Sequence, residues 1–525
     1  MSLPAAPRPR RSMLLWAVLA IAMVVFSYLF IIMLAAACVY LPFQLLFSES
    51  SSGTNALLLF GFGLVIAGGL LWSLVPRPDK FTPPGPTLTA REHPRLFAEL
   101  EKIALSLREP MPSEVYLIGD VNAWVADRGG ILGFGSRRVM GLGLPLMSAL
   151  TVSQFRAVLA HEFAHYYGGD TSLGPWVYKT KMAMIRSFKT MGSLGGLARQ
   201  AVLAVMHTVV SFVLESYFKL FLRAINFVSR KQEFRADELA CLVAGPQPLI
   251  DGLQVIHGAA AAWQPYWNDE VVPVLNNGRK PALGDGFARF LRAPLISEQV
   301  TRILDKELQD GKATPYDTHP PLRERIAAAQ LVAAPEFSVD SRPASSLLEH
   351  PDAAELHFIH TLNPDLPADA LTHIEWDKVP TEVTVPFWRK LASDYGQLFE
   401  GVTCESVPDV IPRLSAIGES IRDPKGMLLS REQRTQRAAH LVGVGLALTL
   451  LANGWELHSE PGIFHFQKGT EKFSPFATTY ELLQGKITRE SWLTRCQELG
   501  IFQRPLFPSV SAAITASAAE ASVAE

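Results

Sequence analysis

Cysteine is scarce in this sequence, and its scarcity excludes several classes of protein. Four cysteines occur among 525 residues, far apart from one another, and they form no C-x-x-C pair. A disulfide framework or a cysteine-built zinc site is therefore not expected, and the thiols are expected to be reduced. The sequence also lacks a G-x-S-x-G nucleophile motif, a phosphate-binding glycine loop and an internal repeat.

A net charge of one sign is missing as well. Lys and Arg together number 48, against 50 Asp and Glu residues, which leaves a formal net charge of -2. A generic nucleic-acid-binding protein would carry a basic excess. The sequence therefore predicts no nucleic-acid partner.

Charge is locally absent from two long stretches near the N-terminus, Met13 to Phe47 and Thr54 to Val75. Each exceeds the roughly 20 apolar residues that a helix needs to cross a bilayer. The first stretch is too long for a signal-peptide core, and no cleavage site follows it. The two stretches therefore predict a transmembrane helical hairpin.

The basic residues that flank this hairpin predict its orientation. Arg8, Arg10 and Arg11 precede the first stretch, and Arg77 and Lys80 follow the second, whereas the connector SESSSGT has no Lys or Arg. Because positive residues stay on the cytoplasmic side, both ends of the hairpin are expected there. Everything after residue 76 is then expected to be cytoplasmic.

After a proline-rich linker, the chain alternates between helical and β-prone patterns. Residues 91 to 108 predict a helix, and the runs VYLIG, NAWVAD and RRVMGLG predict a small antiparallel sheet. Far downstream, LVGVGLALTLL is too short to span a membrane and predicts a buried core helix, followed by a hairpin at WELHSEPGIFHFQKG. The expected domains are residues 1–80 with the two membrane helices, 81–333, 334–510 of unknown role, and a disordered tail at 511–525.

The segment AVLAHEFAHYYGGD lies on a predicted helix. Thr151-x-x-Gln154 forms a capping box at its start, apolar residues follow at helical spacing, and Gly168-Gly169 is expected to end it. On such a helix His161 and His165 are one turn apart, so both imidazoles can bind one Zn2+.

Glu162 is offset from His161 by about a hundred degrees around the helix, so it can reach a water molecule beside the metal without binding the metal itself. Two histidines and a neighbouring base are typical of zinc peptidases. The alternative is an ordinary amphipathic helix with two surface histidines.

Two histidines are too few for a zinc site, and the best candidate for a third ligand lies in SRKQEFRADELACLVAG. Glu233 and Asp237 are one turn apart there, beside Ala236 and Ala240, which permit close helix packing. Glu233 can complete a His2Glu site, and Asp237 can accept a hydrogen bond from the free ring nitrogen of a ligand histidine. The alternative is a surface helix with ion pairs between its Arg and Glu residues.

Taken together, these residues resemble the HtpX-like and type I CAAX-prenyl-protease family of membrane zinc metallopeptidases, within the gluzincins. The resemblance covers about residues 90 to 330 and rests on four motifs in the family's order. They are Asn122-Ala123-Trp124, His161-Glu162-x-x-His165, Glu233-Phe-x-Ala-Asp237, and Thr318-His319-Pro320-Pro321 with Arg325.

The resemblance implies a role for each motif. Glu233 would be the third ligand of one Zn2+ per chain, with Asp237 as its supporting partner. His319 and Arg325 would face the reaction centre as catalytic groups beside Glu162. Residues 122–124 would pair with the backbone of a polypeptide substrate.

The fold implied is α+β and mainly helical, with a gluzincin-type catalytic domain after the hairpin and an extra α+β domain at the C-terminus. The function implied is that of a zinc metalloendopeptidase integral to a membrane, expected to be the bacterial inner membrane, with lipid as a further partner. It would act on extended polypeptides on the cytoplasmic side, with membrane-protein quality control as one role. The alternative is a non-catalytic membrane scaffold or chaperone-like adaptor that kept the fold.

One departure from the family concerns the stretch between His165 and Glu233. HtpX-like enzymes have two further membrane spans there, whereas this chain has one weak apolar run, AVLAVMHTVVSFVL at 201–214. A single crossing would place Glu233 across the membrane from the histidines. We therefore expect no crossing, and expect residues 176–228 to lie in the membrane interface or re-enter, with basic residues facing anionic lipid.

Overall fold

The structure is a computed structural model that describes residues 11–47, 53–130, 135–166, 174–311, 314, 317, 319–367, 369–421 and 430–507. Two compact units divide the chain. Unit 1 is Met1–Trp263 with Val300–Asp365, and unit 2 is Gln264–Gln299 with Leu366–Glu525. The domain boundaries expected at residues 80 and 333 stay predictions, and the tail expected at 511–525 lies outside the described residues.

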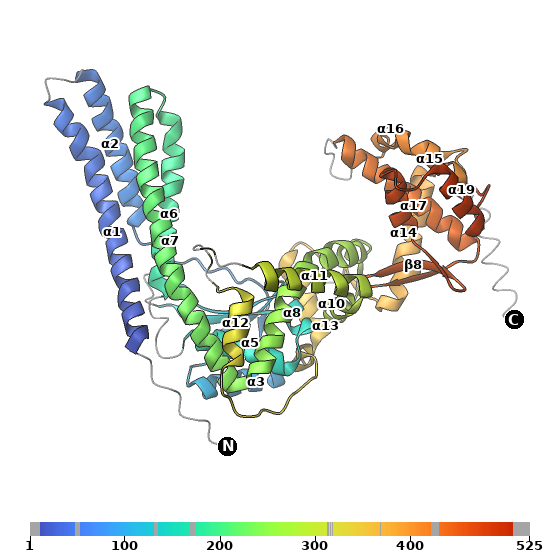
Figure 1. Ribbon diagram of the computed structural model, residues 1–525, viewed down its shortest axis with the longest axis horizontal. Helices are drawn as coiled ribbons and strands as arrows, with labels where there is room; N and C mark the ends of the chain where they lie inside the picture. The colour runs from blue at the N-terminus through green and yellow to red at the C-terminus, as the bar shows by residue number, and fades with distance from the viewer. Residues whose placement is uncertain are drawn as a thin grey trace. The chain divides into compact units, whose positions relative to one another are not determined.

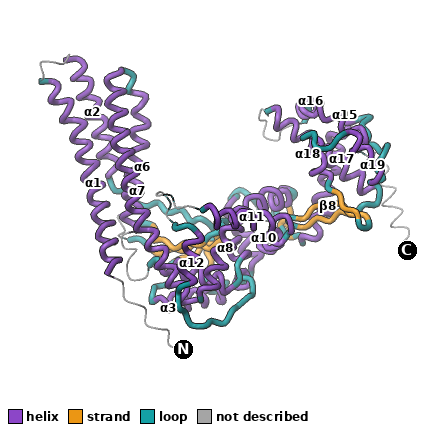
Figure 2. Tube along the Cα trace, viewed as in Figure 1, coloured by secondary structure: helices purple, strands orange, loops and turns teal. Residues whose placement is uncertain are grey.

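Helices predominate in both units, with three small sheets among the described residues (Figure 2). The mainly helical α+β class expected from the sequence is therefore confirmed. The N-terminal hairpin is confirmed as two helices, α1 (Arg11–Leu46) and α2 (Gly53–Leu74). Ile21–Leu46 of α1 and all of α2 are long and apolar enough to cross a membrane. Most of their connector lies outside the described residues.

Two further helices lie along this hairpin, α6 (Gly174–Leu194) and α7 (Ala201–Ala244), as Figure 1 shows. One apolar cluster joins all four helices, and it includes Ile31, Leu70, Met184 and Leu214. α7 is a third helix long and apolar enough to cross a membrane. Residues 176–228 were expected to lie in the interface or re-enter. In the structure α6 and α7 form a second hairpin that packs on the first, and its position in the membrane stays a prediction.

Polar contacts between the two hairpins explain why the sequence concealed α6. Its basic residues interrupt the apolar pattern, yet Arg186 donates to the carbonyl oxygen of Ser73 at 3.0 and 2.7 Å, at the C-terminal end of α2. Ser187 bonds Ser73 through their hydroxyls at 2.6 Å. A search for long uncharged stretches therefore misses α6, because the charge of Arg186 is stabilised by a backbone carbonyl at the C-terminal end of α2.

After the first hairpin, unit 1 contains a four-stranded sheet in the order β1-β2-β4-β3. Its strands are β1 (Thr87–Leu88), β2 (Glu114–Ile118), β3 (Ala123–Arg128) and β4 (Arg137–Gly143). The sheet is mixed rather than wholly antiparallel, because β4 lies between β2 and β3 and runs parallel to β2. This order leaves β3 as an edge strand.

Several helices accompany this sheet in unit 1. They are α3 (Pro94–Leu107), α4 (Leu144–Ala149), α5 (Val152–Ala164), the end of α7, most of α8 (Pro246–Pro265), much of α11 (Pro294–Asp310), α12 (Leu322–Gln330) and α13 (Pro351–Leu362). The apolar face of α5 is fully buried at Phe155, Leu159 and Phe163. This burial fixes the helix that carries both histidines.

Unit 2 has its own core around α17 (Arg431–Ala452), whose residues 441–447 are all buried, so the expected core helix is confirmed. The expected hairpin is also confirmed as β7 (Glu456–Glu460) and β8 (Ile463–Lys468), joined by β9 (Glu471–Phe473). The remaining elements are α9 (Val272–Asn276), β5 (Arg279–Lys280), α10 (Leu283–Arg292), β6 (Thr372–His373), α14 (Val385–Tyr395), α15 (Val407–Val410), α16 (Leu414–Glu419), α18 (Pro475–Leu483) and α19 (Arg489–Glu498).

The four-helix bundle makes a prediction about membrane topology. A reporter inserted near Gly195, between α6 and α7, should lie on the opposite side of the membrane from one inserted after Lys80. The physical reason is that α6 and α7 run alongside α1 and α2 and bury their apolar faces against them. Reporter fusions at the two sites measure this, and both reporters on one side would mean that the second hairpin does not cross.

Candidate metal centre

The helix α5 brings two imidazoles to one point. Its start is fixed by the expected capping box, in which Thr151 and Gln154 each accept from the other's backbone amide at 3.3 and 2.9 Å. His165 follows the last helical residue but keeps right-handed helical geometry. The Nε2 atoms of His161 and His165 are therefore only 3.2 Å apart.

The last third of α7 supplies a carboxylate to the same point. Glu233 Oε2 lies 3.4 Å from His161 Nε2, and Glu233 Oε1 lies 3.5 Å from His165 Nε2. The close approach of α7 to α5 is helped by Ala236 and Ala240, which are buried. In the described part of the chain, these three residues form the one group of His, Cys, Asp and Glu side chains with the spacing of a metal site.

The spacing of the three residues fits zinc. Ligand atoms held about 2.0–2.1 Å from a tetrahedral Zn2+ lie roughly 3.3–3.4 Å from one another. Three contacts are close to this value: 3.2 Å between the two Nε2 atoms, 3.4 Å from His161 Nε2 to Glu233 Oε2, and 3.5 Å from His165 Nε2 to Glu233 Oε1. Glu233 Oε2 is buried and lies 2.9 Å from His319 Nδ1. A buried carboxylate that faces two imidazoles is suited to binding a cation together with them.

The two histidines differ in protonation. Burial disfavours the charged form of His161, but its contacts with Asp237 and Glu233 outweigh burial and raise its pKa to about 9. Burial, reinforced by the charge on His161, lowers the pKa of His165 to about 4. The carboxylates thus attract one positive charge to the site, where a metal cation would take the place of the proton.

Behind the ligands, Asp237 and Arg325 form a buried ion pair. Asp237 Oδ1 lies 2.9 Å from His161 Nδ1, as expected for a residue that fixes the imidazole. Arg325 on α12 donates to Asp237 from Nε at 2.8 Å and from Nη2 at 2.7 Å. Burial opposes the ionisation of Asp237, and the Arg325 and His161 contacts lower its pKa nevertheless.

The contacts of Arg325 reach both Asp237 and the candidate metal ligands. The guanidinium was expected to face the reaction centre as a catalytic group, and both of its short hydrogen bonds go to Asp237. Its Nη2 atom also lies 3.4 Å from His161 Nδ1 and 3.8 Å from Glu233 Oε2. A catalytic role for Arg325 stays a prediction.

The predicted base, Glu162, and the predicted catalytic residue His319 both lie at this centre. Burial raises the pKa of the Glu162 carboxyl to about 7, although the charge on His161 lowers it. The side chain of His319 is 63 % exposed, and its Nδ1 atom approaches Glu233. Thr318, which precedes it in the motif, lies outside the described residues.

The Asn122-Ala123-Trp124 motif begins the edge strand β3. Asn122 is exposed and Ala123 is buried. Trp124 is half-buried and its indole lies across Gly141 on β4, where any side chain would collide with it. Trp124 thus packs against the sheet rather than projecting freely.

Tyr166 belongs to the site, although sequence reasoning assigned it no role. It directly follows His165, and its hydroxyl donates to the carbonyl of Val125 on β3 at 3.0 Å. The guanidinium of Arg138 lies over its ring at 3.9 Å. Its position beside a metal-binding histidine was the one available signal, but a sequence does not reveal which strand the hydroxyl contacts.

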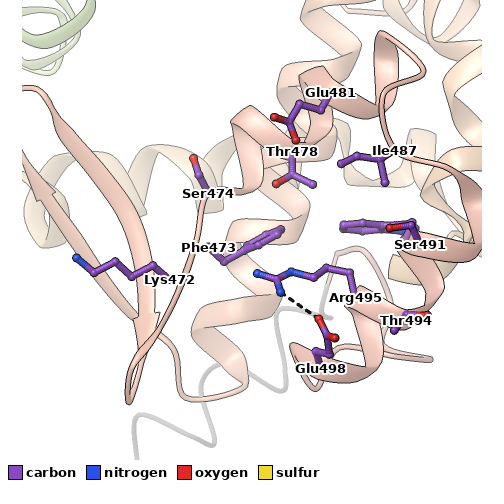
Figure 3. Close-up of a pocket in the computed structure, with 11 residues that line it drawn as sticks. Lys472, Phe473, Ser474, Thr478, Glu481, Ile487, Ser491, Thr494, Arg495 and Glu498 are labelled. Atoms are coloured by element: carbon purple, nitrogen blue, oxygen red, sulfur yellow. Dashed lines mark hydrogen bonds and ion pairs between the residues drawn. The ribbon is translucent and has the colours of Figure 1, made fainter. Parts of the chain in front are cut away.

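A separate cavity of about 560 Å³ lies in unit 2, between β9 and the helices α18 and α19. Figure 3 shows Arg495 pointing into it, near Phe473, with an ion pair to Glu498. None of the residues predicted for the site lines this cavity. The candidate metal centre is confined to unit 1.

Two histidines one helical turn apart, a glutamate from a second helix and a neighbouring carboxylate define a class, that of the H-E-x-x-H metallopeptidases. Comparison with known proteins agrees. Residues 90–333 match the family model "Peptidase family M48". Residues 90–333 are thus similar to peptidase family M48, and the relatives named HtpX proteases, together with the apolar helices long enough to span a membrane, support a membrane metalloprotease.

The relatives are distant. A protein named "Protease HtpX homolog" from Herminiimonas arsenicoxydans is 24 % identical over 301 residues, which are 53 % of this chain and 88 % of that protein. "Protease HtpX homolog 2" from Methanosarcina mazei is 27 % identical over 304 residues, which are 56 % of this chain and 90 % of that protein. No solved structure matches the chain.

The buried ion pair makes a prediction about Arg325. Arg325→Met should destabilise the fold by about 3–5 kcal/mol, because it leaves the carboxylate of Asp237 buried and uncompensated. Zinc affinity should fall by roughly 10- to 100-fold, because Asp237 would no longer hold His161 in place. Thermal unfolding and metal titration measure the two effects. Arg323→Met, at an exposed position on the same helix, is the matched control. An unchanged zinc affinity would contradict the positioning role.

Proposed function

We propose that this protein is a zinc-dependent metalloendopeptidase that cleaves extended polypeptides at the cytoplasmic surface of the membrane. The observation that carries the proposal is the convergence of His161, His165 and Glu233, with separations suited to tetrahedral zinc. When bound, one Zn2+ per chain supplies Lewis acidity toward the scissile carbonyl and toward water.

Glu162 is the general base of the proposed reaction. It follows a metal-binding histidine and stands at the same centre, and its pKa of about 7 suits both acceptance and release of a proton near neutral pH. Its carboxylate takes a proton from the attacking water molecule. The same carboxyl then delivers that proton to the leaving amine, so the base is regenerated when the peptide bond has broken.

His319 is proposed to stabilise the negative charge that develops on the carbonyl oxygen. Its exposed imidazole stands beside Glu233 and is free to turn toward a substrate. Arg325 has a different role from the one expected from the resemblance. We assign it to positioning, through Asp237 and the Nδ1 atom of His161.

The substrate is proposed to add as a strand to the free edge of β3, beside Asn122, Ala123 and Trp124. Strand addition selects polypeptides that are locally extended, because folded segments cannot present their backbone groups. Ala123 is 2 % exposed in the structure, so a substrate has to displace the groups that cover this residue. Trp124 supports the strand through its packing on Gly141.

The location of the reaction follows from α7, which belongs both to the bundle and to the metal centre. Ile225 is the last residue of α7 that packs with the bundle, and Glu233 follows eight residues later, a helical rise of about 12 Å. The reaction centre is therefore proposed to lie close to the membrane surface. Segments of membrane proteins that emerge there suit such a site, and their quality control in the bacterial inner membrane is the proposed role, with membrane lipid as a second partner.

The first prediction of this mechanism concerns Glu162, the proposed general base. Glu162→Gln should abolish zinc-dependent cleavage of an unfolded protein such as β-casein, while zinc content stays at one ion per chain. The amide cannot accept the proton of water, yet its shape leaves the ligands in place. Peptide mass mapping and metal analysis of the purified protein measure the outcome. If the wild-type protein bound zinc and cleaved nothing, the non-catalytic scaffold would be favoured.

The second prediction concerns His319, the proposed hydrogen-bond donor to the oxyanion. His319→Ala should lower kcat by roughly a hundredfold or more at unchanged zinc content, because one charge-stabilising donor is lost. His360→Ala, on a helix that carries no predicted site residue, is the control. Steady-state kinetics together with metal analysis distinguish the roles: loss of zinc would make His319 a ligand, and unchanged kcat would remove it from the mechanism.

A further inference from the structure

The Tyr166 hydroxyl links the end of the metal-binding helix to the edge strand β3. It donates to the carbonyl of Val125 at 3.0 Å, and the hydroxyl oxygen of Tyr166 in turn accepts a hydrogen bond from the amide of Asp127. The ring is held from its other side by Arg138, which in turn contacts Glu109 at 3.0 Å. Tyr166 is buried, so these contacts exclude water from the link.

The hydrogen-bond phase of β3 determines which of its backbone groups face the free edge. The amide of Gly143 on β4 donates to the carbonyl of Asn122 at 2.9 Å. Because an antiparallel ladder alternates, residues 122, 124 and 126 bond to β4, and residues 123, 125 and 127 point their backbone groups outward. Tyr166 therefore occupies two outward groups, the carbonyl of Val125 and the amide of Asp127.

We propose that Tyr166 is a positioning residue that ends the substrate-binding edge of β3 and thereby sets which peptide bond reaches the metal. This inference rests on the proposed function. An added strand can bond the amide and carbonyl of Ala123 and the amide of Val125. It cannot continue along the edge, because the next carbonyl and amide already belong to Tyr166.

Tyr166 directly follows a residue of the metal centre, so the end of the substrate-binding edge is tied to the position of the metal centre. The residue before it is His165, whose imidazole contributes to the metal centre. A single residue thus joins the edge that holds the substrate backbone to the helix that holds the metal. The hydrogen bonds between the Tyr166 hydroxyl and β3 then determine the register of the substrate relative to the catalytic groups.

The test is Tyr166→Phe in the full-length, zinc-loaded protein, because it removes the hydroxyl and keeps the ring against Arg138. With β-casein as the substrate, kcat/KM is expected to fall about tenfold, the effect of losing one hydrogen bond. New cleavage sites are expected one or two residues from those of the wild type, at unchanged zinc content. Tyr480→Phe, at an exposed position in unit 2, is the control and should change neither.

A second measurement does not depend on activity. Hydrogen exchange at the amide of Asp127 is expected to be faster in Tyr166→Phe than in the wild type, because the oxygen that protects this amide is gone. Wild-type cleavage sites and unchanged exchange in the variant would overturn the inference and leave the proposed function standing. Loss of zinc from the variant would also overturn it, since the hydroxyl would then support the metal centre rather than the register. A wild-type protein without zinc-dependent cleavage would instead refute the proposed function, and the inference with it.

Discussion

The convergence of His161, His165 and Glu233 is the constraint on which the rest of unit 1 depends. These side chains come from two segments that are far apart in the sequence. The two Nε2 atoms lie 3.2 Å apart, and each lies 3.4 or 3.5 Å from an oxygen of Glu233. Such proximity requires α5 and α7 to pack closely. Small alanines on α7 permit this packing, and the buried apolar face of α5 holds the helix against the remainder of the domain.

Buried charge is the main energetic cost of the arrangement. Glu233, Asp237 and Arg325 are each less than 9 % exposed, and a buried charge is tolerated only when it is paired. The bidentate contact between Arg325 and Asp237 satisfies one carboxylate completely. The carboxylate of Glu233 has no bidentate partner of this kind and instead faces the imidazoles of His161 and His165, with which it can bind a cation.

One continuous helix, α7, joins the apolar helix bundle to the candidate metal centre. A 44-residue helix has a length of about 66 Å, more than twice the roughly 30 Å core of a bilayer, so its first half can pack in the bundle while its last third reaches α5. Unit 2 contributes none of the residues predicted for the site and has a separate core around α17. The family match likewise ends at residue 333.

Much of the protein follows from local patterns in the sequence. The capping box at Thr151, the helical spacing of His161 and His165, the apolar first hairpin and the buried helix α17 are all encoded within short segments. Helices are stabilised by contacts three and four residues apart, so their existence and their ligand spacing can be derived without the fold. The choice of Glu233 as a partner was accessible because its segment combines a carboxylate pair with small residues.

Contacts between distant segments were decided by the tertiary structure alone. The sequence indicated interfacial residues where α6 and α7 form a second hairpin, because it does not reveal that Ser73 at the end of α2 satisfies Arg186. It indicated a catalytic role for Arg325 but not the two hydrogen bonds that join the guanidinium to Asp237. It left Tyr166 without a role, because the alternation of hydrogen bonds along β3 exists only once β4 is paired with it. The role of a side chain that contacts a distant part of the chain depends on tertiary packing. The spacing of residues within a short segment cannot predict such a contact.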